Sequence, residues 1–448
     1  MTMLGAPNKQ AAITVLALGV LTFLWCLPGI DVRGTKGAHV AVDEPQYLLS
    51  ATSLWDDLDL DISDELAEER WREYHEAELP EQTKPLDGGR RVSPHDPLLP
   101  LVLAVPMGLF GWVGAKVAMA AMAGVLAALL LWTAVVRLRV PTTRAAVTVA
   151  CFSLSLPLTA YATQVYPELP AALAVTVAIA AVLGDARRTA AVAVVALPWL
   201  SVKYAPVATV LALWLLVRHR AHARAIVAWF VVNGLAFAGL HQLIYGGWTP
   251  YAAGDHFVGG ELTVAGTSPN YGGRARRLLA LLVDRDYGLV AWQPAWLLAI
   301  PAVASAARRR DPLVLVFAAG WLTATFVALT MHGYWWPGRQ VVVVLPVVVL
   351  LVAVHLPAIA SAAGLVVGGA LWWWFVLGDS TFVVHWRSHS WLRPLLVPAN
   401  DDELLTVWIV IVAILVVLSV RGDQDPRRRE RADTDDARAH ANGDGAVG

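Results

Sequence analysis

Two adjacent carboxylates, Asp43 and Glu44, follow the first apolar stretch of the chain, in the run Val-Asp-Glu-Pro-Gln-Tyr-Leu-Leu (42–49). A carboxylate at the edge of a membrane is costly to remove from water and is therefore a candidate functional group. Asp43 could act as a general base, or it could simply cap the short helix that begins with Glu44. Apolar residues continue at helical spacing as far as Trp55, which predicts an amphipathic helix on the membrane surface.

Three later groups stand where apolar stretches begin or meet. Glu168 follows Tyr166 and a proline, Lys203 separates two apolar half-helices, and Arg339 follows an aromatic turn that contains Tyr334. The planar fork of an arginine suits phosphate recognition, and a buried lysine needs a partner. Each group also has a simpler explanation: the helix dipole for the glutamate, an extended path to water for the lysine, and an interfacial belt for the tyrosine.

The histidines and the other acids carry weaker signals. His95 and Asp96 precede an apolar run and could bind a sugar, a phosphate or a metal, although turn chemistry explains the prolines beside them. Asp56–Asp61 alternates acidic and apolar residues and is predicted to be a solvated loop edge. His385 and His389 have the i, i+4 spacing of metal ligands, but no matching acidic motif accompanies them, so we predict no zinc site there.

The composition indicates an integral membrane protein. Of 448 residues, 57% are hydrophobic and 15% are charged, which excludes an ordinary soluble domain. The chain contains no phosphate-binding loop, dinucleotide fingerprint or nucleic-acid-binding face. We predict an all-α polytopic membrane protein with twelve spanning helices. The predicted spans are 11–30, 113–136, 144–163, 168–184, 188–201, 204–217, 225–245, 287–306, 312–332, 339–356, 358–378 and 404–420.

The arginines predict the orientation. The run 97–111 is short for a span and is predicted to dip into the membrane without crossing it. With that assignment, most of the arginine clusters between the helices face the cytoplasm. The tail and Lys9 then face the same side. Both termini are then cytoplasmic, and the loop 31–112 is extracytoplasmic. Residues 1–420 form the membrane domain, and the charged tail 421–448 is predicted to be disordered.

Taken in order, these pieces resemble the GT-C superfamily of integral-membrane glycosyltransferases, in particular bacterial members related to the protein mannosyltransferase and aminoarabinose transferase group. The resemblance rests on Asp-Glu-Pro-Gln-Tyr-Leu-Leu, Asp59-Leu-Asp61, His-Asp-Pro-Leu-Leu-Pro (95–100), Tyr166-Pro-Glu168, Trp-Leu-Ser-Val-Lys-Tyr (199–204) and Trp-Pro-Gly-Arg (336–339). The chain departs from larger relatives because it has a short tail where they carry a soluble outer domain.

The resemblance implies an enzyme of a bacterial cytoplasmic membrane that moves a sugar from polyprenyl phosphate to a hydroxyl of an envelope glycan, lipid or protein. Asp43 would be the general base. A divalent cation is possible and, if present, would be held by Asp43 and Glu168. A transporter of lipid-linked sugars and a non-catalytic scaffold remain alternatives. The resemblance and the sidedness assign substrate binding to Glu44, Tyr47, His95, Asp96, Tyr166, Glu168, Lys203, Tyr334 and Arg339.

Overall fold

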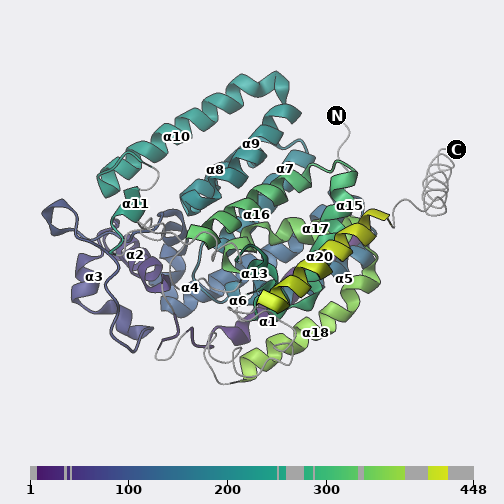
Figure 1. The fold of residues 1–448 in the computed structure, drawn as a ribbon. Coiled ribbons are helices and arrows are strands. Elements are labelled where there is room, and N and C mark those ends of the chain that lie inside the picture. Colours follow the sequence, from purple (N-terminus) through teal and green to yellow (C-terminus); the bar gives the residue numbers. More distant parts are fainter. Residues whose placement is uncertain are drawn as a thin grey trace.

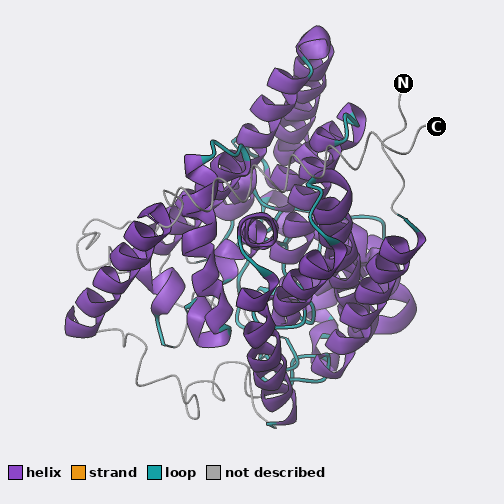
Figure 2. Ribbon diagram, turned by 90° about the vertical axis from the view of Figure 1, so that its right-hand side faces the viewer, coloured by secondary structure: helices purple, strands orange, loops and turns teal. Residues whose placement is uncertain are grey.

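The computed structural model describes residues 8–34, 38–40, 43–249, 252–258, 277–285, 288–330, 338–378 and 402–421. Within these ranges the fold is helical, and the only extended pairings are three isolated bridges (Figures 1 and 2). Two of the bridges lie within the loop 31–112, Ala38 to His75 and Asp61 to Val92, and the third joins Thr83 to Phe257. This part of the prediction, an all-helical chain, is therefore confirmed.

In the part of the chain that the structure describes, four helical segments are long and apolar enough to cross a membrane. They are Lys9–Gly29, Leu98–Arg137, Arg220–Tyr245 and Ala358–Leu377. They contain α1 (Lys9–Cys26), α4 (Leu98–Trp132), α10 (Ala223–Tyr245) and α18 (Ala358–Leu377). The remaining predicted spans contain shorter apolar stretches, such as Leu313–Val327 and Glu403–Ser419, or interrupted helices. The other continuous helices are α2 (Glu44–Asp56), α3 (Ser63–Ala67), α7 (Glu168–Leu183), α8 (Arg187–Leu200), α9 (Ala205–Arg218), α11 (Ala252–Asp255), α13 (Arg277–Val283), α16 (Leu313–Thr330) and α20 (Asp402–Arg421).

Two predicted spans are interrupted. The stretch 144–163 forms α5 (Thr142–Ser153) and the single turn α6 (Leu158–Tyr161). Twelve residues of α-helix extend only about 18 Å, which is short of a bilayer core of about 30 Å. The stretch 287–306 is likewise divided into α14 (Leu289–Trp292), a 3-10 segment and α15 (Ala299–Arg308). In both cases a proline follows the first piece and removes a backbone donor, which favours the interruption.

Helix α4 changes direction at Gly111, where φ is 61° and ψ is −161°. A straight helix of the forty residues 98–137 would be about 60 Å long, twice the thickness of a bilayer core. A Cβ built on Gly114 would lie 2.3 Å from the carbonyl oxygen of Pro106, although residues eight apart in a straight helix are separated by about 12 Å. The chain therefore folds back at Gly111, as a run that dips and returns would do.

The predicted surface helix is instead part of the interior. Residues 44–53 of α2 are all buried, and the helix packs against α4. The ring of Trp55 lies over Gly108 of α4, where a Cβ would come within 2.0 Å of it. The apolar spacing of this segment was correctly interpreted, but its partner is protein and not the lipid surface.

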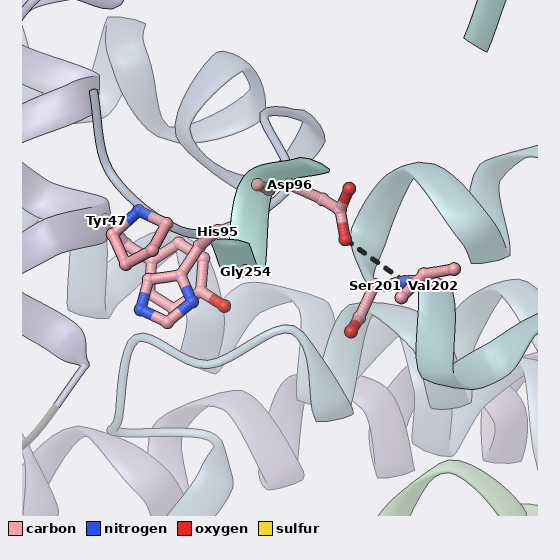
Figure 3. A pocket seen from close by; sticks show the side chains of 8 residues that line it. Tyr47, His95, Asp96, Ser201, Val202 and Gly254 are labelled. Carbon is pink, nitrogen blue, oxygen red and sulfur yellow. Dashed lines mark hydrogen bonds between the residues drawn. The ribbon is translucent and has the colours of Figure 1, made fainter. Parts of the chain in front are cut away.

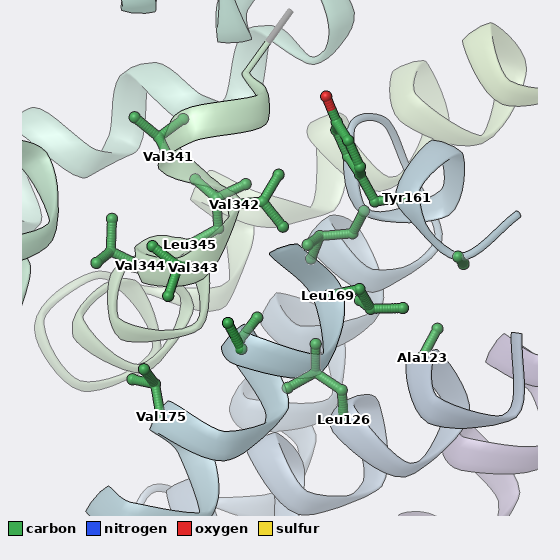
Figure 4. Packing of buried hydrophobic residues seen from close by; sticks show 14 of the residues in the cluster. Ala123, Leu126, Tyr161, Leu169, Val175, Val341, Val342, Val343, Val344 and Leu345 are labelled. Carbon is green, nitrogen blue, oxygen red and sulfur yellow. The ribbon is translucent and has the colours of Figure 1, made fainter. Parts of the chain in front are cut away.

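A segment that is apolar on every side lies at the centre of the core. The 3-10 helix η8 (Arg339–Val344) continues directly into α17 (Leu345–His355), and residues 339–353 are all buried. η8 packs against α7 and α16, and Figure 4 shows Val341–Leu345 beside residues of α7. Because every face of this segment is covered, the residue at its first position, Arg339, is held in a fixed place.

Helix α10 has the opposite character. It lies along the upper edge of the molecule in Figure 1 and is mostly exposed. Its buried residues are Ile226 near its start and His241 and Tyr245 near its end. At the same end of the bundle lie α2, α3 and α11, whereas α5 and α15 lie at the opposite end (Figure 1).

Candidate functional site

Four charged side chains from four separate elements form one connected cluster, here called the ion cluster: Asp43, Glu168, Lys203 and Arg339. Nη2 of Arg339 donates to Oδ2 of Asp43 at 2.7 Å, and its Nε donates to Oε1 of Glu168 at 2.8 Å. Nζ of Lys203 donates to the same oxygen of Glu168 at 2.6 Å. Arg339 therefore bridges the two carboxylates, and Glu168 joins the two cations.

Each member of the ion cluster stands at the start of a helix or between two helices. Glu168 is the first residue of α7, and Arg339 is the first residue of η8. Lys203 lies in the 3-10 turn η5 (Val202–Tyr204) between α8 and α9. Because the N-terminus of a helix favours a negative charge, the position of Glu168 is locally stabilised as well as paired.

Asp43 occupies the N-cap position of α2 but does not cap it. The backbone carbonyl of Asp43 accepts the first helical hydrogen bonds, but the side chain of Asp43 makes no capping hydrogen bond. Its carboxylate is turned to Arg339, which is 296 residues away in the chain. The simple capping explanation therefore fails for this residue.

The ion cluster is buried and electrically balanced. Side-chain exposure is 0% for Glu168, 6% for Arg339, 14% for Asp43 and 19% for Lys203. Two cations face two anions, which is the arrangement that makes buried charges tolerable. Oε2 of Glu168 is buried and accepts no hydrogen bond from any described residue. Such an orphaned acceptor is a place where a hydroxyl donor of a ligand would be favoured.

The environment sets the charge of Asp43. Burial by itself would raise the pKa of Asp43, but the charge of Arg339, its hydrogen bond and the charge of Lys203 outweigh it. The pKa of this carboxyl therefore lies below its ordinary value of 3.8. Asp43 is ionised at neutral pH and can accept a proton.

His95 lies on the open side of Asp43. Its Nε2 is 4.0 Å from Oδ1 of Asp43, and its ring stacks on Tyr47 with centroids 4.7 Å apart. Burial lowers the pKa of His95 below 6.5 and Arg339 lowers it further, whereas Asp43 acts in the opposite direction. His95 is therefore neutral at pH 7, and the separation of 4.0 Å leaves Oδ1 of Asp43 without a direct hydrogen bond from it.

Asp96 organises the wall beside this pair. Its Oδ2 accepts from the backbone N–H of Val202 at 3.1 Å, next to Lys203 (Figure 3). Its Oδ1 lies 3.1 Å from Nε2 of His241. A small cavity of about 30 Å³ opens here. The cavity is lined by Tyr47, Pro94, His95, Asp96, Ser201, Val202, Ala253 and Gly254.

Glu44 and Tyr166, two of the predicted substrate-binding residues, have supporting positions. Oε1 of Glu44 accepts from the backbone N–H of Val165 at 2.6 Å, and Glu44 is fully buried, so it ties α2 to the segment before α7. Cζ of Arg339 lies 4.3 Å from the centre of the Tyr166 ring, and this cation–π contact helps to hold the guanidinium in place. Tyr334, His385 and His389 lie outside the described residues.

Three polar residues of this region were not predicted. Oε1 of Gln340 accepts from Nζ of Lys203 at 3.2 Å, and Nζ of Lys116 donates to the carbonyl of His39 at 2.6 Å. His241 pairs with Asp96. Each is a polar residue beside or within an apolar run, and that signal could have drawn attention to them. Nothing in the local sequence indicates their partners.

The predicted cation between Asp43 and Glu168 does not fit this arrangement. Arg339 donates to both carboxylates, so the guanidinium stands where a bridging cation would have to be. Carboxylates that already share an arginine are not a free ligand set. The mechanism proposed below therefore uses no metal at this position.

The chain matches no protein-family model, no curated protein and no solved structure with significance.

Proposed function

We propose that this chain is an integral-membrane glycosyltransferase of the GT-C type, which transfers a sugar from a polyprenyl-phosphate donor to a hydroxyl acceptor. The observation that supports it best is the ion cluster: a base, Asp43, buried next to an arginine and a lysine at one end of an apolar helical bundle. This combination of a proton acceptor and two phosphate-binding cations is what the reaction requires.

The donor phosphate has two cations to bind. Arg339 and Lys203 both donate to one oxygen of Glu168, so both are aimed at a single region. A phosphate that reaches this region would be held by a bidentate fork and a point charge, the two common modes of phosphate recognition. Both cations would then oppose the negative charge that grows on the leaving lipid phosphate.

Donor binding would also strengthen the base. In the ion cluster, Arg339 holds the pKa of Asp43 down. A phosphate that competes for the guanidinium would weaken this pairing, so the pKa of Asp43 would rise towards the range in which a carboxylate removes protons efficiently. The base would thus be strongest when the donor is in place.

In the chemical step, Oδ1 of Asp43 takes the proton of the acceptor hydroxyl, and the acceptor oxygen attacks the anomeric carbon. The bond between that carbon and the phosphate oxygen breaks, and its electron pair leaves on the polyprenyl phosphate. The orphaned Oε2 of Glu168 is suited to accept a hydrogen bond from a sugar hydroxyl.

The cavity at His95 is one edge of this site. Its volume of about 30 Å³ is far below the roughly 300–1,000 Å³ of sites for small molecules. It is lined by His95 and Ser201 (Figure 3), and Nε2 of His95 lies 4.0 Å from Oδ1 of Asp43, whereas Arg339 donates to Oδ2. We assign this edge to the acceptor hydroxyl, because it adjoins the oxygen of Asp43 that Arg339 does not occupy.

The proposal includes twelve spans with both termini in the cytoplasm and the ion cluster on the extracytoplasmic side. The distribution of arginines supports this orientation. The gathering of α2, α3 and α11 at one end of the bundle agrees with a single functional face. A transporter would instead place its charges along a path that reaches both ends.

Lipid analysis of a strain that lacks the gene tests the proposal. We expect one polyprenyl-phosphate sugar to accumulate and one envelope glycan to disappear, and the wild-type gene to reverse both changes. The purified protein in nanodiscs should then release polyprenyl phosphate from that donor. Movement of the donor across vesicles without any transfer product would refute the proposal.

A further inference from the structure

The end of α10 holds two consecutive residues of the candidate site, His95 and Asp96. Nε2 of His241 lies 3.1 Å from Oδ1 of Asp96. The hydroxyl of Tyr245, one turn further along α10, donates to the carbonyl oxygen of His95 at 2.8 Å. His241 and Asp96 are 145 residues apart in the chain, so packing of α10 against the site makes this contact.

Both ring nitrogens of His241 have partners, although the side chain is completely buried. Side-chain exposure is 0% for His241 and 8% for Asp96. Nδ1 lies 2.9 Å from the carbonyl oxygen of Phe237, one turn earlier in α10. Because a carbonyl oxygen only accepts, Nδ1 carries a proton, and Nε2 is the nitrogen that pairs with the carboxylate. The rings of Phe237 and Tyr245, with centroids 3.8 and 5.2 Å from that of the imidazole, help to fix its plane.

Asp96 carries this constraint to the backbone of η5. Its Oδ2 accepts from the backbone N–H of Val202, the first residue of η5 (Figure 3). Ser201, at the N-cap position of η5, makes no capping bond with its side chain. The carboxylate of Asp96 therefore supplies the missing cap, from a residue 106 positions earlier in the chain.

Lys203, the next residue of η5, extends from this backbone into the ion cluster. Its Nζ donates to Oε1 of Glu168 at 2.6 Å and to Oε1 of Gln340 at 3.2 Å. The stem of a lysine is flexible, so the place of its ammonium depends on a fixed backbone as well as on its acceptors. When a phosphate takes the place of Glu168 at the ammonium, the backbone of η5 becomes the more important constraint.

We propose that His241 is a positioning residue for the donor phosphate, which acts through Asp96 on the ammonium of Lys203. It holds the carboxylate that caps η5, and η5 fixes the backbone from which the lysine extends. This inference rests on the proposed function, because that function assigns the donor phosphate to Lys203. The role of His241 is indirect, since Asp96 lies between the imidazole and η5.

The competing explanation is that His241 is purely structural. A buried, hydrogen-bonded histidine could tie α10 to the bundle, and its loss would then lower stability without changing the affinity for phosphate. The observation that favours positioning is that His241 and Tyr245 hold adjacent residues, both of which line the cavity at the acceptor edge.

Two amide substitutions of His241 separate these roles. A glutamine amide reaches about as far as Nε2 and keeps a donor for Asp96, whereas an asparagine amide reaches only about as far as Nδ1. We expect the Kd for farnesyl phosphate and the KM for the donor to rise about tenfold or more in His241→Asn and in His241→Ala, because a contact from a charged group to phosphate is weakened. His241→Gln should restore both values towards those of the wild type.

The test measures binding of farnesyl phosphate to the full-length protein in nanodiscs by calorimetry, together with initial rates of transfer and thermal unfolding. Farnesyl phosphate presents the same phosphate group as the released polyprenyl phosphate. The control is Asn233→Ala, because the side chain of Asn233 donates to the carbonyl of Trp229 within α10. This variant should bind as the wild type does. The comparison of asparagine with glutamine remains valid where the alanine variant does not fold.

Three results would overturn the inference. They are unchanged affinity in His241→Asn with a lowered melting temperature, equal losses of affinity in His241→Asn and His241→Gln, and a wild-type protein that binds no farnesyl phosphate. Failure of the proposed function gives a different result. Binding that weakens in His241→Asn and recovers in His241→Gln, in a protein that transfers no sugar, would refute the enzyme and support the positioning role.

Discussion

Replacement of Asp43 by asparagine tests whether the carboxylate of Asp43 has a catalytic role or only a structural one. The side chain keeps its size, and its amide oxygen can still accept from Nη2 of Arg339, which now lies 2.7 Å from Oδ2. Only the negative charge and the ability to take a proton are lost. The ion cluster changes from a net charge of zero to +1, while Arg339 retains its bond to Glu168.

The expected costs differ for folding and for catalysis. Removing one of the two anions that balance a buried arginine costs about 3–5 kcal/mol. A typical folding free energy of roughly 5–15 kcal/mol tolerates this loss. Loss of a general base lowers the rate by about 10²–10⁴-fold. Asp43→Asn should therefore insert and fold but transfer sugar at least about a hundredfold more slowly.

The assay measures transfer from the accumulated donor by the purified variant, together with thermal unfolding in the same detergent. The matched control is Asp56→Asn, which breaks an aspartate–arginine pair at the other end of the same helix. That pair is exposed, so its loss should cost about 0–1 kcal/mol and leave transfer unchanged. Near-normal transfer by Asp43→Asn would refute the base assignment, and equal losses in the two variants would show that α2 is merely disturbed.

Three further predictions follow from the geometry. Arg339→Lys should abolish transfer and lower the melting temperature, because one ammonium cannot reproduce the fork that now bridges two carboxylates; a melting temperature equal to that of the wild type would contradict this. Gly111→Ala should cost about 1–3 kcal/mol of stability in urea unfolding, since its φ of 61° and ψ of −161° suit only glycine. Gly239→Ala, in an open helical position, should be neutral or slightly stabilising, and equal effects would contradict the fold-back. Because the pKa of His95 is lowered on folding, the unfolded chain binds a proton below about pH 6.5 that the folded chain does not. Stability should thus be fully present above that pH and fall as the pH decreases, and His95→Gln should reduce this slope in thermal melts between pH 5 and 7.

The helices themselves were largely predictable. Apolar composition and flanking prolines are local properties, so the ends of α7, α8, α9 and α18 agree with the predicted ranges to within about two residues. The exceptions were the interruptions of 144–163 and 287–306, where a proline follows the first helical piece, and the burial of α2. The burial depends on which surface faces the helix, and the amphipathic spacing of α2 is the same for a lipid surface and for a protein partner.

The four residues of the ion cluster could also be identified as candidates from the sequence. Asp43, Glu168, Lys203 and Arg339 attracted attention because each is a charge next to an apolar run. Each nevertheless had a local explanation of equal weight, such as a cap, a dipole or a path to water. The sequence alone could not choose between the two.

What the sequence by itself determined is therefore the helical, membrane-compatible character of the chain and a short set of charged candidates. Only the tertiary structure decided that the side chain of Asp43 pairs with Arg339 instead of capping α2, and that the arginine also holds Glu168. The physical reason is range: helix formation is set by neighbours a few residues apart, whereas the partner of a buried charge is set by packing between segments that can be 296 residues apart.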